Sequence, residues 1–150
     1  MIDFIDRYFF VFFLGAWLWV AGVVAVSVVF RRRRGKPVFA RLPASTRFSQ
    51  RVASGWSEDN WLRSLGGASN CLMVAVTEKE LIVTPFFPFT LMFLPEIWGL
   101  ELRTPLSQIR HMETVQRLFL AGLRIELANG RKMVLVVRDL EELRAALTAR

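Results

Sequence analysis

The sequence predicts a mainly β fold, an antiparallel sheet closed by a carboxy-terminal amphipathic helix and preceded by one transmembrane helix. Three observations lead to this prediction. An uncharged apolar run fills residues 8–30, two apolar segments flank an Asn-Gly pair within residues 123–137, and an amphipathic pattern ends the chain. With 150 residues, the chain has room for one domain and an appendage, but hardly for two separate cores.

The first element is the run from Tyr8 to Phe30, 23 residues without a charge. At about 1.5 Å per residue, a helix of this length crosses the roughly 30 Å hydrocarbon core of a bilayer. A cleavable signal peptide is the alternative, but it requires a basic start, a shorter apolar run and a small-residue cleavage site. This chain begins with Asp3 and Asp6 instead, and four arginines follow the run. We therefore interpret residues 8–30 as a transmembrane helix.

The net charge of +7 is concentrated directly behind this helix. Residues 1–30 carry −1, residues 31–56 carry +8, and residues 57–150 are neutral. Basic residues are enriched on the cytoplasmic flank of a span. We therefore expect a short extracytoplasmic tail at residues 1–7, with residues 31–150 on the cytoplasmic side of the inner membrane.

The basic residues next to the span are Arg31, Arg32, Arg33, Arg34 and Lys36. Such clusters hold anionic lipid headgroups, at about 1 kcal/mol per residue near the surface. The alternative is that they only stop translocation, which every single-pass protein of this orientation requires. Nucleic acid is not an expected partner, because the cluster lacks a folded face of aromatic and basic residues.

Residues 31–56 are predicted to be a basic juxtamembrane linker. Gly, Pro, Ser and Ala are mixed with isolated arginines there, without a helical or strand period, which is typical of a linker. The folded domain is expected at residues 57–150, starting near Trp56 or Trp61.

Two hairpins are predicted in this domain. Residues 71–77 and 80–84 are apolar and rich in β-branched residues around the charged pair Glu78-Lys79, which favours a first hairpin. In the second, Asn129-Gly130 is expected to form a type I′ turn. This turn places alternate residues on one face: Leu123, Ile125, Leu127, Lys132, Val134 and Val136. The opposite face of the return strand then carries Met133, Leu135 and Val137.

The chain ends in a predicted helix. Asp139 is the expected N-cap and Glu142 completes a capping box, in which side-chain oxygens accept from free backbone N–H groups. Leu140, Leu143 and Leu147 form one apolar stripe. This helix is therefore expected to cover one face of the sheet.

The segments with this arrangement resemble a known family. Residues 72–85 (LMVAVTEKELIVTP) resemble the opening hairpin of bacterial pleckstrin-homology (PH) and GRAM-type domains, and residues 104–113 (TPLSQIRHME) are similar to the segment that leads into a later strand. With the Asn-Gly hairpin and the final helix, the resemblance covers about residues 60–149. It implies a PH-like antiparallel barrel and a non-catalytic module that binds phosphoinositide-type lipids, other lipids or protein segments. Basic residues in the first hairpin loop often bind phosphoinositides in PH domains, whereas Glu78-Lys79-Glu80 is net negative here, which does not favour such a site.

Residues 85–100 are apolar except for the single charge of Glu96. Three prolines and the short uncharged length argue against a second span. Two interpretations stay open: these side chains fill the barrel, or they form a loop that dips into the bilayer interface or docks on a partner. The candidate residues of such a loop are Phe86, Phe87, Phe89, Leu91, Phe93 and Trp98.

No catalytic residue, metal site or cofactor is predicted. His111 is the one histidine, and Ser107 precedes it by four positions, without a plausible acid to orient the ring. Cys71 is the one cysteine, so a disulfide framework and a four-ligand zinc site are both excluded. We expect Cys71 to be a structural thiol and the protein not to be an enzyme.

The expected function is that of a membrane-anchored cytoplasmic module that recognises membrane lipid or a protein partner at the inner membrane surface. The alternative is an accessory subunit of a larger membrane complex. Ala21 and Ala25 have a spacing that supports helix pairing. The span is therefore compatible with a homodimer or with a membrane protein partner. Trp17 and Trp19 lie nearer the middle of the span than the interface, which favours a position against another helix.

Overall fold

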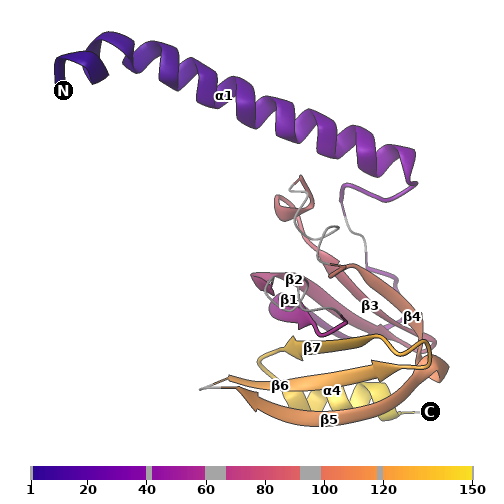
Figure 1. Ribbon diagram of the computed structural model, residues 1–150. Coiled ribbons are helices and arrows are strands. Elements are labelled where there is room, and N and C mark those ends of the chain that lie inside the picture. The colour runs from indigo at the N-terminus through magenta and orange to yellow at the C-terminus, as the bar shows by residue number, and fades with distance from the viewer. Residues whose placement is uncertain (1, 40–41, 60–66, 92–98, 118–119, 150) are drawn as a thin grey trace.

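The computed structural model describes residues 2–39, 42–59, 67–91, 99–117 and 120–149, without the side chains of residues 2–7 and 117. Within these residues the chain forms a long helix, seven antiparallel strands and a short final helix (Figure 1). The helices are α1 (Ile2–Arg33) and α4 (Leu140–Thr148), and the 3-10 turns are η1 (Phe89–Leu91) and η2 (Leu106–Gln108). The strands are β1 (Thr46–Ser57), β2 (Gly67–Thr77), β3 (Glu80–Pro85), β4 (Leu102–Pro105), β5 (Ile109–Arg117), β6 (Leu120–Leu127) and β7 (Lys132–Val136).

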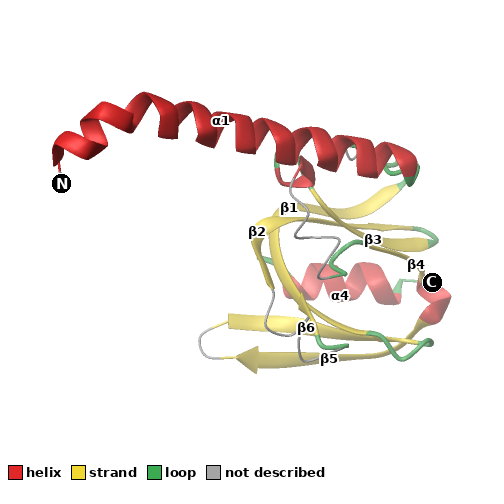
Figure 2. Ribbon diagram, turned by 45° about the horizontal axis from the view of Figure 1, so that its top comes forward, coloured by secondary structure: helices red, strands yellow, loops and turns green. Residues whose placement is uncertain are grey.

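The strands form one sheet in the order β4-β3-β2-β1-β7-β6-β5, which confirms the predicted mainly β class. The sheet curls so that β1–β4 and β5–β7 form two halves around a core, and α4 closes that core (Figure 2). Both halves and the helix contribute to the core, with Val74 and Leu81 from one half, Ile125 and Leu135 from the other, and Leu143 from α4.

The final helix has the predicted cap and the predicted buried face. The carboxylate of Asp139 accepts from the backbone N–H of Glu142 at 3.2 Å. Leu143 and Leu147 are buried and Leu140 packs at the edge of the core. The helix forms because Asp139 caps one of its free N–H groups and its apolar stripe covers the sheet.

The first hairpin also forms as predicted. Leu72 pairs with Pro85 and Val76 with Leu81, so β2 and β3 are joined by the turn at residues 78–79. The Thr77 hydroxyl accepts from the N–H groups of residues 79 and 80, at 3.3 and 3.0 Å, which fixes this turn.

The second hairpin forms at the predicted place, but its predicted register was wrong by one residue. Leu127 and Arg131 close the loop, since the N–H of Leu127 donates to the carbonyl of Arg131 at 2.9 Å. The loop therefore has three residues, 128–130, and of these Gly130 alone has a positive φ, of 81°, as a three-residue hairpin loop requires. The core face consequently carries Leu123, Ile125, Leu127, Met133, Leu135 and Val137, while Lys132, Val134 and Val136 lie on the other face.

Residues 46–56 were expected to belong to the linker, and this was wrong, because they form most of β1, which pairs with both β2 and β7. The inward positions include Ala53 and Gly55, and register shifts on both sides of Ala53 break the alternation that identifies a strand. A Cβ at Gly55 would lie 2.9 Å from the carbonyl oxygen of Val134. β1 therefore needs small residues for close packing, and these residues remove the apolar alternation by which a strand is predicted from sequence.

The long helix α1 contains the predicted span. Residues Tyr8–Arg33 are long and apolar enough to cross a membrane, and the apolar window is not buried inside the structure. The helix does not point away from the domain. It passes over one end of the sheet, and the loop that carries η1 reaches up to it (Figures 1 and 2).

Candidate functional site

Arg31 is the centre of the contact between α1 and the domain. Its side chain is 1% exposed, and its guanidinium donates to the carbonyl of Pro37 at 3.3 Å from Nε and at 2.9 Å from Nη2. Nη2 also lies 3.0 Å from Oε1 of Glu101, directly before β4. A buried charge is tolerated when it is paired and hydrogen-bonded, and Glu101 provides this compensation.

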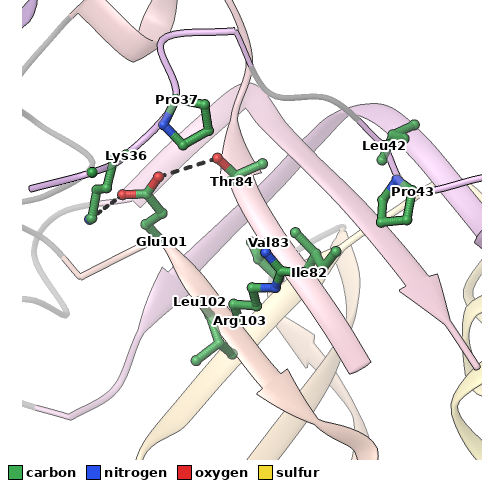
Figure 3. A pocket seen from close by; sticks show the side chains of 11 residues that line it. Lys36, Pro37, Leu42, Pro43, Ile82, Val83, Thr84, Glu101, Leu102 and Arg103 are labelled. Atoms are coloured by element: carbon green, nitrogen blue, oxygen red, sulfur yellow. Dashed lines mark hydrogen bonds and ion pairs between the residues drawn. The ribbon is translucent and has the colours of Figure 1, made fainter. Parts of the chain in front are cut away.

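The carboxylate of Glu101 joins three segments of the chain. Lys36 Nζ donates to its Oε2, and the Thr84 hydroxyl in β3 lies 3.4 Å from its Oε1 (Figure 3). Burial raises the pKa of Glu101, but the hydrogen bond from Lys36 and the charges of Arg31 and Lys36 outweigh burial and hold the pKa below its ordinary value. Glu101 is thus kept ionised between two cations. We call Arg31, Lys36 and Glu101 the junction triad.

A groove of about 580 Å³ opens beside the triad, between the segment that follows α1 and strands β3 and β4 (Figure 3). Leu42, Pro43 and Ile82 contribute apolar wall. At the side of the groove, Arg103 is held by Glu80 through two hydrogen bonds of 2.8 and 2.6 Å. The charged residues that line the groove, Lys36, Glu101 and Arg103, are therefore already paired within the protein.

A second contact lies one helical turn earlier, at Ser27. Ser27 is buried although most of α1 is exposed, and its hydroxyl donates to the carbonyl of Thr90 in η1 at 3.5 Å. Ser27 and Arg31 stand four positions apart, so they lie on the same face of the helix. This face is the one that meets the domain.

Aromatic side chains gather where the β3–β4 loop meets the end of α1. The ring centroids of Phe39 and Phe87 are 5.1 Å apart, and those of Phe86 and Phe89 are 5.2 Å apart. Phe39 is 63% exposed and Phe87 is 49% exposed. We call these four residues the aromatic patch. A hollow of about 280 Å³ next to it is lined by Phe39, Arg51, Met73, Phe86 and Phe87.

The structure divides the predicted anionic-lipid cluster. Arg31 and Lys36 belong to the junction triad, so the prediction is corrected for Arg31, whose charge is buried against Glu101. The cluster residues that are exposed are Arg32, Arg33 and Arg34. The guanidinium of Arg34 lies 4.3 Å from the ring centroid of Phe30, a cation–π distance.

The described part of the predicted apolar segment is divided: η1 packs on α1, whereas Leu100 is 1% exposed and belongs to the core. Phe86, Phe89 and Leu91 are partly buried, and Phe87 is exposed. Phe93 and Trp98 lie outside the described residues.

Two residues of this site were not predicted from the sequence, Ser27 and Glu101. Ser27 did carry a signal, because it is the last polar residue of the uncharged run 8–30 and precedes Arg31 by one turn. Glu101 carried none, since a carboxylate 70 positions from its partner is joined to it only by the fold.

His111, the one histidine, lies on the exposed surface of β5. Its Nε2 is 3.8 Å from Oε2 of Glu113, and both side chains are well exposed. A hydrogen bond from Arg124 lowers the pKa of Glu113 and keeps it an anion. This pair lacks the enclosed site in which a dyad could exclude water. Burial raises the pKa of the partly buried Cys71, which disfavours the reactive thiolate.

No protein-family model matches the chain, and no curated protein matches it either.

Proposed function

We propose that the chain is a membrane-anchored, PH-like binding or scaffolding module without catalytic activity, which recognises membrane lipid or a protein partner at the inner membrane surface. In this proposal α1 crosses the bilayer with its amino terminus outside, and the domain is cytoplasmic. One observation carries the proposal. An exposed apolar helix ends at exposed arginines, and a buried ion pair holds a folded domain at that same end.

The membrane assignment follows from the surface of α1. Its large apolar side chains are exposed around the helix, among them Phe10, Phe12, Phe13 and Leu18, which point to different sides at about 100° per residue. Such a helix lacks the polar face of an amphipathic surface helix. It requires an apolar environment on every side, which a bilayer supplies.

The orientation is supported by the charges at the end of the helix. Arg32, Arg33 and Arg34 are exposed directly after the span, and basic residues near a span favour the cytoplasmic side. Their exposure leaves them accessible to anionic headgroups.

The PH-like assignment is supported by the strand order. Strands that follow each other in sequence pair in the sheet, except β4 and β5, which lie at its opposite edges, and β1 also pairs with β7. The helix α4 covers the core. An antiparallel sheet covered by a final helix supports the PH-like architecture that the sequence resemblance implies, and that resemblance favours binding over catalysis.

Topology is tested with a membrane-impermeant maleimide. In the full chain with Cys71→Ser, the exposed Asn129 is replaced by cysteine. We expect labelling in inverted inner-membrane vesicles and no labelling in intact spheroplasts. Labelling in spheroplasts would contradict the cytoplasmic placement of the domain.

Binding is tested by extracting the full chain from native membranes in polymer nanodiscs and analysing lipid and protein by mass spectrometry. We expect enrichment of anionic lipid over the bulk membrane, lost in the Arg32→Gln, Arg33→Gln, Arg34→Gln triple variant. Arg103→Gln is the control, because Arg103 is exposed but paired with Glu80. An equal lipid composition in the wild type and the triple variant would contradict the proposal that these arginines recognise lipid.

The accessory-subunit function is a second candidate, favoured by Trp17 and Trp19. They are 62% and 72% exposed near the middle of the apolar helix, away from the interface that tryptophan prefers. At about 100° per residue the two side chains lie on opposite sides of α1, so partner helices on both sides would cover them. A stoichiometric integral membrane protein in the nanodiscs, lost in Trp17→Leu, Trp19→Leu, would support this candidate, and its absence would argue against it.

A further inference from the structure

We propose that the aromatic patch inserts into the headgroup–acyl boundary of the bilayer and is a second membrane contact of this protein, beside α1. The inference rests on the proposed function, because it requires α1 to lie in a bilayer. It goes further by naming the surface of the domain that touches lipid: Phe39, Phe86, Phe87 and Phe89.

The depth of the patch follows from the contact between Ser27 and Thr90. Ser27 precedes Phe30, the last residue of the uncharged run, by three positions, or about 4.5 Å along the helix axis. The η1 loop is hydrogen-bonded to the helix at this level. A bilayer that covers α1 as far as Phe30 therefore reaches the loop, and interfacial segments bury their apolar face about 5–10 Å into the boundary region.

The exposed rings are suited to this position. Phe39 comes from the segment after α1 and Phe87 from the β3–β4 loop, and their paired rings remain 63% and 49% exposed. Neither side chain packs in the core of the sheet. Two segments far apart in sequence thus present one apolar surface next to the helix end, where lipid would cover it.

The charges around the patch favour a phospholipid surface as its occupant. Arg51 lines the hollow beside Phe39, Phe86 and Phe87, and Arg34 stacks on Phe30 at the end of α1. Phosphate groups lie just outside the acyl region, so an arginine beside the exposed rings of Phe39 and Phe87 matches the order of layers in a bilayer. The nearby carboxylate of Glu101 is neutralised by Arg31 and Lys36 and does not repel phosphate.

The test places a fluorescent label at single cysteines in the full chain with Cys71→Ser, reconstituted in liposomes of zwitterionic and anionic phospholipid. An environment-sensitive label is attached to Phe87→Cys or Phe39→Cys, and quenching by lipids with shallow or deep nitroxides reports its depth. Leu18→Cys, which lies near the middle of the uncharged run and is 66% exposed, reports the span. Leu120→Cys reports the β5–β6 hairpin, which lies on the side of the domain away from α1 (Figures 1 and 2).

We expect deep nitroxides to quench the label at position 18, and shallow nitroxides to quench it at positions 39 and 87 several-fold more than at position 120. Quenching at position 18 without quenching at 39 and 87 would overturn the inserted patch alone. Absence of quenching at position 18 would overturn the membrane span and with it the proposed function.

A second variant separates insertion from mere proximity. With the label at Arg51→Cys, the Phe39→Ser, Phe87→Ser double variant is expected to lose most of the shallow quenching. Leu120→Ser, which removes a side chain of similar exposure (56%), is expected to leave it unchanged. Equal quenching in both variants would show that the rings do not hold the domain at the lipid.

Discussion

The guanidinium of Arg31 lies 3.0 Å from the carboxylate of Glu101, and this contact joins two segments 70 positions apart. Arg31 lies in the last turn of α1, and Glu101 precedes the edge strand β4. Lys36 adds a second cation to the same carboxylate. The end of α1 is therefore fixed to the sheet by a buried charge network, and the direction of the helix relative to the domain depends on it.

Glu101→Gln should release α1 from the domain. Removal of one partner of a buried ion pair leaves an uncompensated charge and costs about 3 kcal/mol, which corresponds to about 100-fold in the docking equilibrium. The measurement is a distance distribution between spin labels at Trp19→Cys and Asn129→Cys in nanodiscs, in the Cys71→Ser background. A narrow distribution is expected while the glutamate is present, and a broad one in the Glu101→Gln variant.

Glu80→Gln is the matched control for this change. Glu80 also binds an arginine, Arg103, but that arginine is 70% exposed, so the pair is worth at most about 1 kcal/mol. The distance distribution should stay narrow. Broadening in both variants would show that the distribution does not report the buried pair.

The pKa of Glu101 predicts the pH dependence of the same contact. Because the pKa in the folded protein is lower than the ordinary value of 4.5, the unfolded chain takes up this proton first as the pH falls. The stabilisation is therefore complete above about pH 5 and is lost as the pH falls through the folded-state pKa.

Thermal unfolding in nanodiscs between pH 7 and pH 3 measures the stabilisation that the ionised Glu101 provides. Other carboxylates with lowered pKa values, Asp59, Glu80 and Glu113, act in the same direction. The informative quantity is thus the difference in Tm between wild type and Glu101→Gln, which should be largest at neutral pH and should shrink towards pH 3. A constant difference would contradict the linkage to Glu101.

The sequence predicted those elements whose signals are local. The Asp139 cap and the turn at Thr77 depend on residues two or three positions apart, and both form as expected. The strand β1 could not be predicted, because register shifts on both sides of Ala53 break its alternation and Gly55 is required by the close approach of β7. The predicted register of the hairpin at Gly130 was wrong, because an Asn-Gly pair is compatible with a loop of two residues and with a loop of three.

The candidate site was predicted only in part, for the same reason. An apolar span with a basic end, and an apolar loop near residue 86, are visible in the sequence. The helix face that meets the domain decides that Arg31 binds Glu101 and that Arg32 stays exposed. This face is set by tertiary packing, which local composition does not encode.

Thr90→Val should stabilise the loop against the helix. The Thr90 hydroxyl is buried and has no hydrogen-bond partner within the described structure, and a buried unsatisfied polar atom costs about 1–3 kcal/mol. Valine has nearly the same shape without that atom. The expected gain is about 1 kcal/mol, measured as a rise in the urea midpoint of the full chain in detergent.

Thr104→Val tests whether this gain is specific. Thr104 is also buried, but its hydroxyl is 3.2 Å from Oε1 of Gln108, so valine removes a hydrogen bond worth about 1 kcal/mol. The two substitutions should shift the midpoint in opposite directions. A shift of the same sign in both would refute the role assigned to the Thr90 hydroxyl.

Gly55→Ala should destabilise the domain. The new Cβ would lie 2.9 Å from the carbonyl oxygen of Val134, and backbone cannot yield as a flexible side chain can. A cost of about 1–3 kcal/mol is typical of such overpacking. Gly67→Ala is the control in the neighbouring strand, where the nearest atom is 3.6 Å away. Circular dichroism during thermal unfolding should show a lower Tm for the first variant alone.

The direction of α1 predicts a large tilt in the bilayer. The helix passes over the end of the sheet (Figures 1 and 2), so a bilayer crossed at right angles by a docked helix would occupy the space of the nearest strands. The buried pair of Arg31 and Glu101 opposes undocking. The helix must then incline until the domain lies below the headgroups.

We therefore expect a tilt at or beyond about 40°, the upper end of the usual range. Oriented-sample solid-state NMR of the reconstituted, ¹⁵N-labelled chain measures this angle directly. In Glu101→Gln, where the domain is released, the tilt should fall towards the ordinary value of about 20°. A wild-type tilt already near that ordinary value would mean that the domain leaves the helix in the bilayer, and would contradict insertion of Phe39 and Phe87 at the depth that Ser27 sets.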